Sequence, residues 1–388
     1  MKRALYLIVM GVMAVSLLAA CASPTPTATI VTEPTATEIP TVVETTVPTA
    51  TPTEAPVVEK ITVTDALDRT VEFDTYPSRI VIAGKAGFMI ANAAFLFPEA
   101  SERIIGYVPG GQTGNDFIKM VFPQAGDLTP FESDAGAEQI APLNPDVVLL
   151  KSYLKESMGD TIEQVGIKVI YLDLESAEAI NKDIRTLGDL FGNPEKAEQV
   201  IQLNNTATKR VTDLTSGLTD EQKPTVLMLQ YSDKGGEIAF KVPPLDWLQT
   251  NMVEMAGGIP VWKDVPTDGW TTITLEQIAV WNPKVILLVD YKGNAVDIVS
   301  QLKTDEKWVL LDAVKNDKLY AFPLDFQSWD QPDTRWTLGL TWMAGKIQPD
   351  LFPSINMQDE VRTFYTNFYD LSDSVITETI MPLVKGDL

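Results

Sequence analysis

A thirteen-residue segment occurs twice in this chain. Glu138–Leu150 returns as Glu276–Leu288, and nine of the thirteen positions are identical. Each copy reads as a short helix, an Asn-Pro break and a run of Val, Ile and Leu, which is typical of a strand buried on both faces of a parallel sheet. A duplicated unit of this kind predicts two α/β lobes. Ligands of such sheets bind outside the carboxyl ends of the strands, so we expect a ligand cleft between the lobes.

The N-terminus has the pattern of a secretory signal. Basic residues precede an apolar run, Leu5–Ala19, that is too short for an ordinary membrane-spanning helix. The segment Leu18–Cys21 matches a lipobox, and Cys21 is the only cysteine of the chain. An uncleaved anchor helix would leave this cysteine unexplained. We therefore interpret residues 1–21 as a lipoprotein signal peptide and lipobox, with Cys21 as the site of lipidation.

Residues 22–57 have the composition of a tether. They contain twelve Thr and seven Pro, with no Lys, no Arg and no aromatic residue. Such a segment cannot form a core, and its prolines favour an extended polyproline II chain that reaches roughly 100 Å at about 3.1 Å per residue. The folded part is therefore expected from residue 58 onward and outside the cytoplasmic membrane.

Composition excludes several classes of function. The formal net charge is −23 and no basic cluster occurs, which argues against a nucleic-acid partner. The chain has no histidine, so it has no His-based catalytic triad and no His-ligated zinc, manganese or copper site. Nucleotide-binding glycine motifs and a G-x-S-x-G nucleophile motif are also missing from the sequence. We expect a protein that is not an enzyme; an enzyme would have to use carboxylates, Lys, Tyr or Ser.

The folded part divides into three segments. We predict an N-terminal α/β lobe at 58–175, a helical linker at 176–218, and a C-terminal α/β lobe with closing helices at 219–388. The linker contains one long helix that begins at Asn193 as the N-cap residue and ends at Gly217. The other predicted elements are a hairpin at 61–73, strands at 79–83, 146–150, 168–172, 225–229 and 318–322, and helices at 245–256, 336–347 and 360–369.

Four blocks of sequence resemble one known family. Ile61–Val71, Tyr76–Val81, Trp308–Tyr320 and Ser328–Ala344 are similar to substrate-binding proteins of ABC importers of the iron-siderophore and cobalamin type. The resemblance covers roughly residues 60–370. It implies two Rossmann-like parallel-sheet lobes joined by a single long α-helix, with the ligand cleft between them. It also implies modest closure around a metal-chelate ligand and delivery to the transmembrane subunits of an ABC permease.

The resemblance gives the repeated segment a role. In this family a glutamate on each lobe pairs with arginines of the permease, and Glu138 and Glu276 stand at the matching positions. Each glutamate also falls in the first turn of a predicted helix, where the helix dipole favours an acidic residue for structural reasons alone. Permease docking is the preferred interpretation because the repeat places both acids at equivalent points of the two lobes.

The loops that follow predicted strands supply the candidate ligand-binding residues. Charged candidates, which could meet an anionic ligand, are Lys85, Lys151, Lys292 and Arg335. Aromatic candidates, which could pack on a large planar or chelate-bearing ligand, are Tyr153, Tyr231, Tyr291, Phe326 and Trp329. For each residue the alternative is a solvated lysine or a core aromatic side chain. Trp281, Trp336 and Trp342 are assigned to the core.

The missing histidines also bear on the ligand. They disfavour a bare zinc or manganese ion, whereas a ferric siderophore, cobalamin, haem or an oxyanion such as molybdate stays possible. A ferric siderophore is the leading candidate ligand, because siderophores are the broadest ligand class of the family that this sequence resembles. We expect no resident cofactor, since any iron or cobalt would arrive within the ligand. The expected partners are the permease, the chelate and, through the lipid anchor, the membrane. We expect a monomer. The alternative function is that of a ligand-sensing surface lipoprotein without transport.

Overall fold

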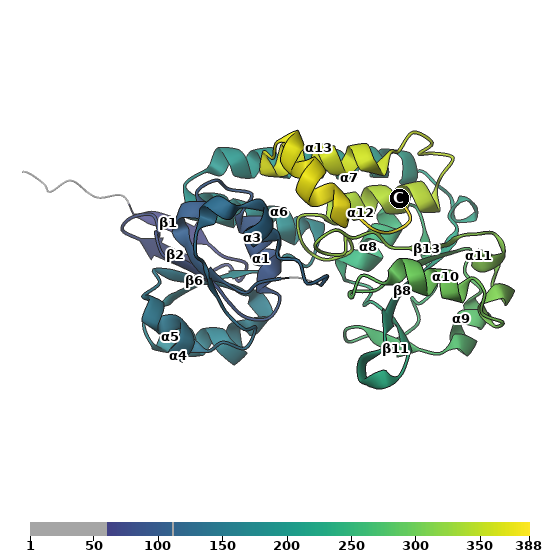
Figure 1. Cartoon of the computed structure of the whole chain (residues 1–388), viewed down its shortest axis with the longest axis horizontal. Coiled ribbons are helices and arrows are strands. Elements are labelled where there is room, and N and C mark those ends of the chain that lie inside the picture. Colours follow the sequence, from purple (N-terminus) through teal and green to yellow (C-terminus); the bar gives the residue numbers. More distant parts are fainter. Residues whose placement is uncertain (1–59, 111) are drawn as a thin grey trace, which may run out of the picture. The chain divides into compact units, whose positions relative to one another are not determined.

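The computed structural model describes residues 60–110 and 112–388. The predicted signal peptide, lipobox, Cys21 and tether lie outside the described residues. From residue 60 onward the described chain forms one compact unit, which contains two α/β sheets and a separate two-stranded hairpin (Figure 1). The predicted fold class is confirmed. The limits of the two lobes and of the linker stay a prediction.

The N-terminal lobe is built on a five-stranded parallel sheet in the order β5-β4-β3-β6-β7. The strands that the sequence predicts in this sheet, β3, β6 and β7, lie next to one another. The predicted hairpin, β1 and β2, is antiparallel and separate from the sheet. The bounds are β1 Ile61–Thr64, β2 Thr70–Phe73, β3 Ile80–Ile82, β4 Ile104–Tyr107, β5 Thr129–Pro130, β6 Val147–Lys151 and β7 Lys168–Leu172.

The helices of this lobe surround the sheet. Of these, α1 is buried at seven of its eight residues, because Ala, Met and Ile follow one another without a polar face. In contrast, α6 is amphipathic and buries Ile180, Ile184 and Leu187 on one face. The bounds are α1 Gly87–Ala94, α2 Ala100–Arg103, α3 Phe117–Val121, α4 Ala137–Ile140, α5 Asp160–Gln164 and α6 Ala177–Phe191.

The C-terminal lobe has a six-stranded mixed sheet. Four strands, β8, β10, β12 and β13, are parallel, while β9 runs antiparallel to β8 and β11 antiparallel to β9. The strand bounds are β8 Thr225–Ser232, β9 Ala239–Val242, β10 Ile259–Pro260, β11 Thr271–Ile273, β12 Val285–Val289 and β13 Leu319–Ala321. The helix bounds are α8 Leu248–Met255, α9 Leu275–Trp281, α10 Ala295–Leu302, α11 Asp312–Lys315, α12 Trp336–Ile347, α13 Met357–Tyr369 and α14 Asp373–Val375.

The two copies of the repeated segment adopt the same local structure. Each forms a short helix, α4 or α9, followed by an Asn in the left-handed conformation, Asn144 with φ 47° or Asn282 with φ 37°. Asn tolerates this conformation better than most residues, and the proline that follows cannot continue a helix. The chain then enters β6 or β12, both buried at every residue. The repeat therefore places an equivalent helix, turn and central strand in each sheet.

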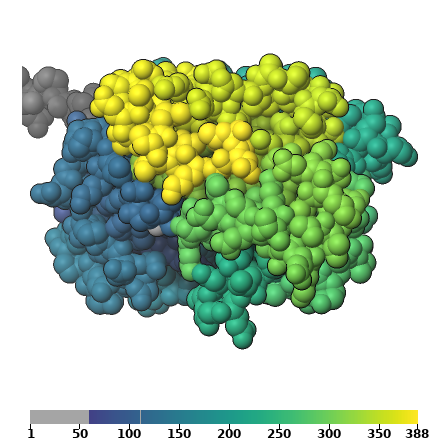
Figure 2. Space-filling model, turned by 45° about the vertical axis from the view of Figure 1, so that its right-hand side comes forward, coloured from purple at the N-terminus to yellow at the C-terminus, as the bar shows by residue number. Residues whose placement is uncertain are grey.

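The long linker helix α7, Pro194–Thr215, spans the two lobes (Figure 1). Asn193 caps it by accepting a hydrogen bond from the backbone N–H of Lys196 at 3.1 Å, as the sequence predicts. Its buried positions, which include Val200 and Val211, pack against α6 and α12, although Leu214 near its end is exposed. The C-terminal segment, drawn in yellow, covers parts of both lobes in the space-filling view (Figure 2).

One continuous hydrophobic cluster includes residues from both sheets and from α7, α12 and α13. Within the described residues no helix has the length and apolar character needed to cross a membrane. The surface is hollowed between the blue residues of the N-terminal lobe and the green residues of the C-terminal lobe (Figure 2).

Candidate ligand-binding site

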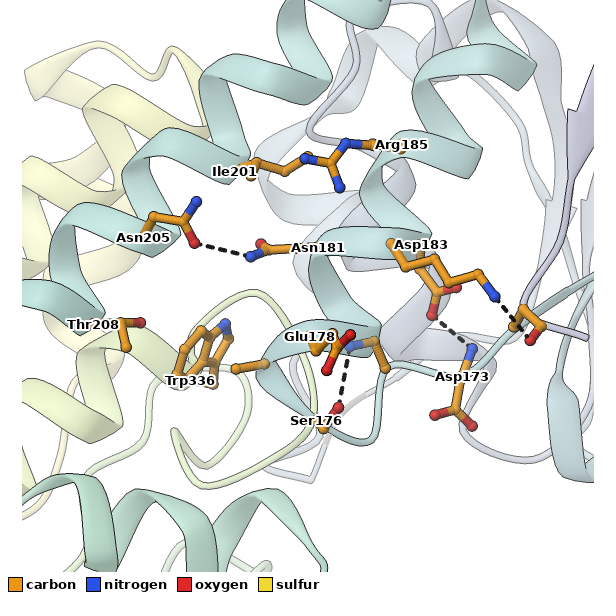
Figure 3. A pocket seen from close by; sticks show the side chains of 14 residues that line it. Asp173, Ser176, Glu178, Asn181, Asp183, Arg185, Ile201, Asn205, Thr208 and Trp336 are labelled. Atoms are coloured by element: carbon orange, nitrogen blue, oxygen red, sulfur yellow. Dashed lines mark hydrogen bonds between the residues drawn. The ribbon is translucent and has the colours of Figure 1, made fainter. Parts of the chain in front are cut away.

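A pocket of about 780 Å³ lies beside α7, and residues of both lobes line it. Its wall is made by α6, α7, the loop after β7 and the first residue of α12 (Figure 3). The N-terminal sheet contributes Asp173, directly after β7. The C-terminal lobe contributes Trp336, which follows the loop that leaves β13. The pocket therefore lies at the carboxyl end of β7, the side on which parallel sheets bind their ligands.

Side-chain amides join the two helices that form the pocket wall. Asn181 of α6 donates to Asn205 of α7 at 3.1 Å (Figure 3). Behind this wall, Asn204 donates to the side-chain oxygen of Asn181 at 3.0 Å. Ser176 fixes the start of α6 by accepting a hydrogen bond from the backbone N–H of Ala179 at 3.1 Å. These contacts hold a wall of neutral polar side chains in one geometry.

Trp336 carries an unsatisfied donor at this wall. The side chain is almost fully buried, and its indole N–H has no hydrogen-bond partner among the described residues. The nitrogen lies on the side of the ring that faces α6 (Figure 3). A buried donor without a partner costs about 1–3 kcal/mol, so an acceptor that reaches this nitrogen is stabilised; because the nitrogen is itself buried, a ligand reaches it only if the pocket wall moves.

Asp183 shapes the loop after β7. Its carboxylate accepts hydrogen bonds from the backbone N–H groups of Asp173 and Leu174, both at 2.7 Å. Burial raises the pKa of Asp183 to about 7, against the lowering effect of these two hydrogen bonds. This carboxyl group therefore titrates close to neutral pH while it holds the edge of the pocket.

A second connection joins the lobes besides α7. Asn92 of α1 donates to the carboxylate of Asp333 at 2.7 Å, and Tyr369 of α13 donates to the backbone carbonyl of Asn92 at 3.0 Å. The side chain of Gln112 accepts a hydrogen bond from the backbone N–H of Ser328 at 2.9 Å. The loop between β13 and α12 is thus attached directly to the N-terminal lobe.

Glu138 and Glu276 are exposed in the first turns of α4 and α9. The backbone N–H of Glu276 itself and the side chain of Thr274 lower the pKa of Glu276, so this carboxylate is ionised at neutral pH. Val280, one helical turn after Glu276, is 83% exposed.

Residues 127–325, just over half of the chain, match the family of periplasmic binding proteins. The chain belongs to this family. The molybdate-binding protein MolA of Haemophilus influenzae is 23% identical over 80% of this chain and 91% of that protein. YvrC of Bacillus subtilis, an ABC transporter substrate-binding lipoprotein, is 26% identical over 75% of this chain and 87% of that protein.

The fold comparison agrees with the sequence comparison. A periplasmic solute binding protein from Veillonella parvula superposes with a TM-score of 0.67 and 26% identity, covering 83% of this chain and 97% of that one. This periplasmic binding protein is accordingly a substrate-binding protein of an ABC importer and not an enzyme. The family resemblance that the sequence indicates is confirmed, and the ligand is considered below.

Five of the predicted ligand-binding residues keep exposed surface. Lys85 is exposed, and Tyr153 is 52% exposed with its hydroxyl donating to the backbone carbonyl of Lys85 at 3.2 Å. Tyr231 and Tyr291 are half-buried, and the hydroxyl of Tyr291 donates to the carboxylate of Asp330 at 2.8 Å. Lys292 is exposed and forms an ion pair with an aspartate, Asp233.

The other four predicted residues are fully buried in the described conformation and expose no surface to a ligand: Lys151, Phe326, Trp329 and Arg335. Lys151 pairs with Glu175 at 2.7 Å. Arg335 pairs with two carboxylates at 2.8 Å each, and its guanidinium lies 4.4 Å from the centre of the Phe117 ring. Lys151 thus neutralises a partly exposed glutamate, and Arg335 neutralises two buried aspartates. Of the tryptophans assigned to the core, Trp336 and Trp342 are buried and Trp281 is partly buried.

The sequence analysis missed the residues of the pocket wall. The rule that selects loops after strands applies equally to Asp173, which follows the correctly predicted strand β7, so a signal existed. Asn181 and Asn205 carry no such signal because they lie within helices assigned to the linker. Only the packing of α6 against α7 brings them together.

Among the described residues, no group of three or more His, Cys, Asp or Glu side chains is arranged to hold a metal ion. Dispersed carboxylates near the pocket, such as Asp173 and Glu178, therefore act as charges or hydrogen-bond acceptors.

Proposed function

We propose that this protein binds a metal chelate between its lobes and delivers it to an ABC permease, with a ferric siderophore as the leading ligand. The observation that carries the proposal is the pocket beside α7, because it lies at the carboxyl end of β7 and Trp336 of the C-terminal lobe also lines it. A metal bound within a chelator needs no protein ligands. The described part of the chain accordingly needs no group of His, Cys, Asp or Glu side chains arranged to hold a metal ion, and contains none. Cobalamin, haem and a molybdate-type oxyanion are the alternatives; MolA is named for molybdate.

The unsatisfied N–H of Trp336 gives this proposal a direct test. We expect Trp336→Phe to weaken binding of a ferric siderophore by about tenfold, because one hydrogen bond contributes about 0.5–1.5 kcal/mol. Trp342→Phe is the matched control, since Trp342 is equally buried but its indole already donates to the backbone carbonyl of Asp387 at 2.6 Å. Calorimetric titration of residues 57–388 measures both variants. Equal affinities of the two variants for the ligand would place it outside this pocket.

Delivery requires a docking surface, and we assign this role to Glu138 and Glu276. Both carboxylates are exposed at equivalent points of the repeated segment, as contacts with permease arginines require. We also propose that Cys21 carries the lipid that holds the protein at the membrane and that the protein works as a monomer. YvrC, which is described as a lipoprotein, supports the anchor by similarity.

Docking and binding are separable by mutation. The double variant Glu138→Ala, Glu276→Ala should abolish uptake while its ligand affinity in calorimetry stays unchanged. Glu195→Ala is the matched control, because Glu195 is also an exposed glutamate in the first turn of a helix, α7, but lies outside the repeat. Normal uptake by cells that carry the double variant would contradict the docking assignment.

A further inference from the structure

We infer that the bound chelate carries no net negative charge, so the site selects a neutral or cationic ligand over an oxyanion or a polyanionic chelate. This inference rests on the proposed function, which places the ligand between the lobes. It follows from the charges at the strand ends and in the pocket, from the helix N-termini there, and from the aromatic side chains of the C-terminal lobe.

The cations near the pocket and the strand ends are already neutralised by carboxylates of the same chain. Five such pairs form, and the fifth joins the loops after β8 and β12 of the C-terminal lobe. The pairs are Lys151–Glu175 at 2.7 Å, Lys182–Asp68 at 2.6 Å, Arg185–Glu198 at 2.7 Å and Arg335–Asp325 at 2.8 Å, together with Lys292–Asp233. Lys85 and Lys234 are exposed in these loops and have no ion pair with a described residue. An anionic ligand would thus have to separate existing pairs or rely on these two lysines.

Carboxylates in the pocket are not balanced in the same way. Asp173 and Glu178 line it, and neither forms an ion pair with a described residue. Asp183, which also lines it, carries partial negative charge at neutral pH because its pKa is raised to about 7. The two cations of the lining, Lys182 and Arg185, are paired with acids that do not line the pocket. The electrostatic potential in the pocket is therefore expected to be negative, which repels an anion and attracts a cation.

Helix N-termini offer an anion a second mode of binding. Ser176 caps α6 by accepting a backbone N–H at 3.1 Å. The first turns of α1, α10 and α12 have no side-chain cap. A carboxylate nevertheless lies at the start of α10 and of α12, because Asp290 and Asp333 accept the backbone N–H groups of Asn294 and Arg335 at 2.8 Å each. Of these three helices, only α1 has beside it an exposed lysine that forms no ion pair with a described residue, Lys85, so a bound anion would have to act there or through Lys234.

Aromatic side chains at the C-terminal lobe favour the same class of ligand. Trp270 makes edge-on contacts with Trp247 and Tyr291, with ring centres 6.2 and 6.1 Å apart, and all three rings are half-buried. Tyr291 lies in the loop after β12, at the carboxyl end of that strand. Half-exposed aromatic rings bind apolar organic surface, and their faces attract cations.

The test is a titration of residues 57–388 with probes of different charge. The probes are the ferric complex of ferrioxamine B as a cation, ferrichrome as a neutral trihydroxamate, a ferric tricatecholate as a trianion, and molybdate as a dianion. We expect saturable binding of the cation or the neutral complex, and binding of both anions weaker by about a hundredfold or more, since two charge contacts of about 1.4 kcal/mol each suffice. Added salt should weaken binding of the cation and leave the neutral complex unchanged.

A charge variant supports the titration. Glu178→Gln should weaken binding of the cationic complex by about threefold to tenfold, because this complex interacts with the carboxylate charge. Binding of the neutral complex should not change. Glu195→Gln, with its carboxylate outside the pocket, should change neither. The inference would be overturned if molybdate or the tricatecholate bound more tightly than the other probes and if this binding were lost in Lys85→Gln. The proposed function would then still stand. Failure of every probe to bind would instead refute the leading ligand of the proposed function, a ferric siderophore, and the inference that rests on it.

Discussion

Replacing Arg335 by methionine tests the connection that joins the loop before α12 to the N-terminal lobe. Arg335 is fully buried and pairs at 2.8 Å with both Asp325 and Asp333, which are fully buried as well. Asp333 also accepts the side-chain hydrogen bond of Asn92 from α1. Methionine keeps much of the apolar length of arginine but removes its charge, so two carboxylates would remain buried without a cation.

The expected loss of unfolding free energy is large. Removing one partner of a buried ion pair costs about 3–5 kcal/mol because the remaining charge stays desolvated. Burial raises the pKa of Asp333, and Arg335 is the main group that opposes this rise. Without Arg335 the folded-state pKa of Asp333 rises further above the unfolded value, so the folded protein takes up a proton more readily. The destabilisation should therefore be greatest near pH 8 and smaller near pH 5.

Urea unfolding of residues 57–388 at both pH values measures this effect. The control is Arg362→Met, because Arg362 pairs with Asp373 at 2.7 Å but the two side chains are 37% and 83% exposed. An exposed pair contributes about 0–1 kcal/mol. Equal losses for the two variants would refute the reasoning, and so would a destabilisation by Arg335→Met that grows as the pH falls.

Three further predictions concern stability. Burial raises the folded-state pKa of Asp183 from the ordinary 3.8 to about 7, so the contribution of this group to stability falls as the pH rises between these values. Asp183→Asn should remove up to about 4 kcal/mol of this pH dependence. Unfolding midpoints measured from pH 4 to 8 show the effect. Gly339→Ala should destabilise by about 1–3 kcal/mol because the added Cβ overlaps the backbone carbonyl of Trp329, whereas Gly345→Ala, whose nearest neighbour would lie at 3.6 Å, should not; urea unfolding compares them. Asn144→Ala should cost about 1–2 kcal/mol for its left-handed backbone in the same assay, and a neutral result would contradict the role given to the Asn-Pro break.

Much of the fold follows from the sequence because its signals are local. The runs of Val, Ile and Leu in the repeated segment, Glu138–Leu150 and Glu276–Leu288, predict strands that are buried on both faces, and β6 and β12 are buried at every residue. Asn193 and Pro194 predict the start of α7 to the residue. Other helix starts are predicted less accurately. The helix α13 begins three residues before its predicted start, directly after the N-cap residue Asn356.

Much less of the candidate site follows from the sequence, because burial and ion pairing depend on residues far apart in the chain. Lys151 looks like a ligand contact at the end of a strand until Glu175 and the backbone after β7 enclose it. The sequence suggests that Arg335 can contact a ligand. In the folded protein α1, α3 and α13 cover it, and its guanidinium contacts the Phe117 ring and the Tyr365 hydroxyl. Residue type and position after a strand predict which loops surround a cleft. They do not show which charges in those loops are already neutralised.

The central claim is that one ligand is held by both lobes. Hydrogen exchange of residues 57–388, followed by mass spectrometry with and without the tightest-binding chelate of the charge series, tests it directly. The account predicts slower exchange on ligand binding both in residues 173–181 of the N-terminal side and in residues 289–294 of the C-terminal lobe. Slower exchange confined to one lobe would contradict it.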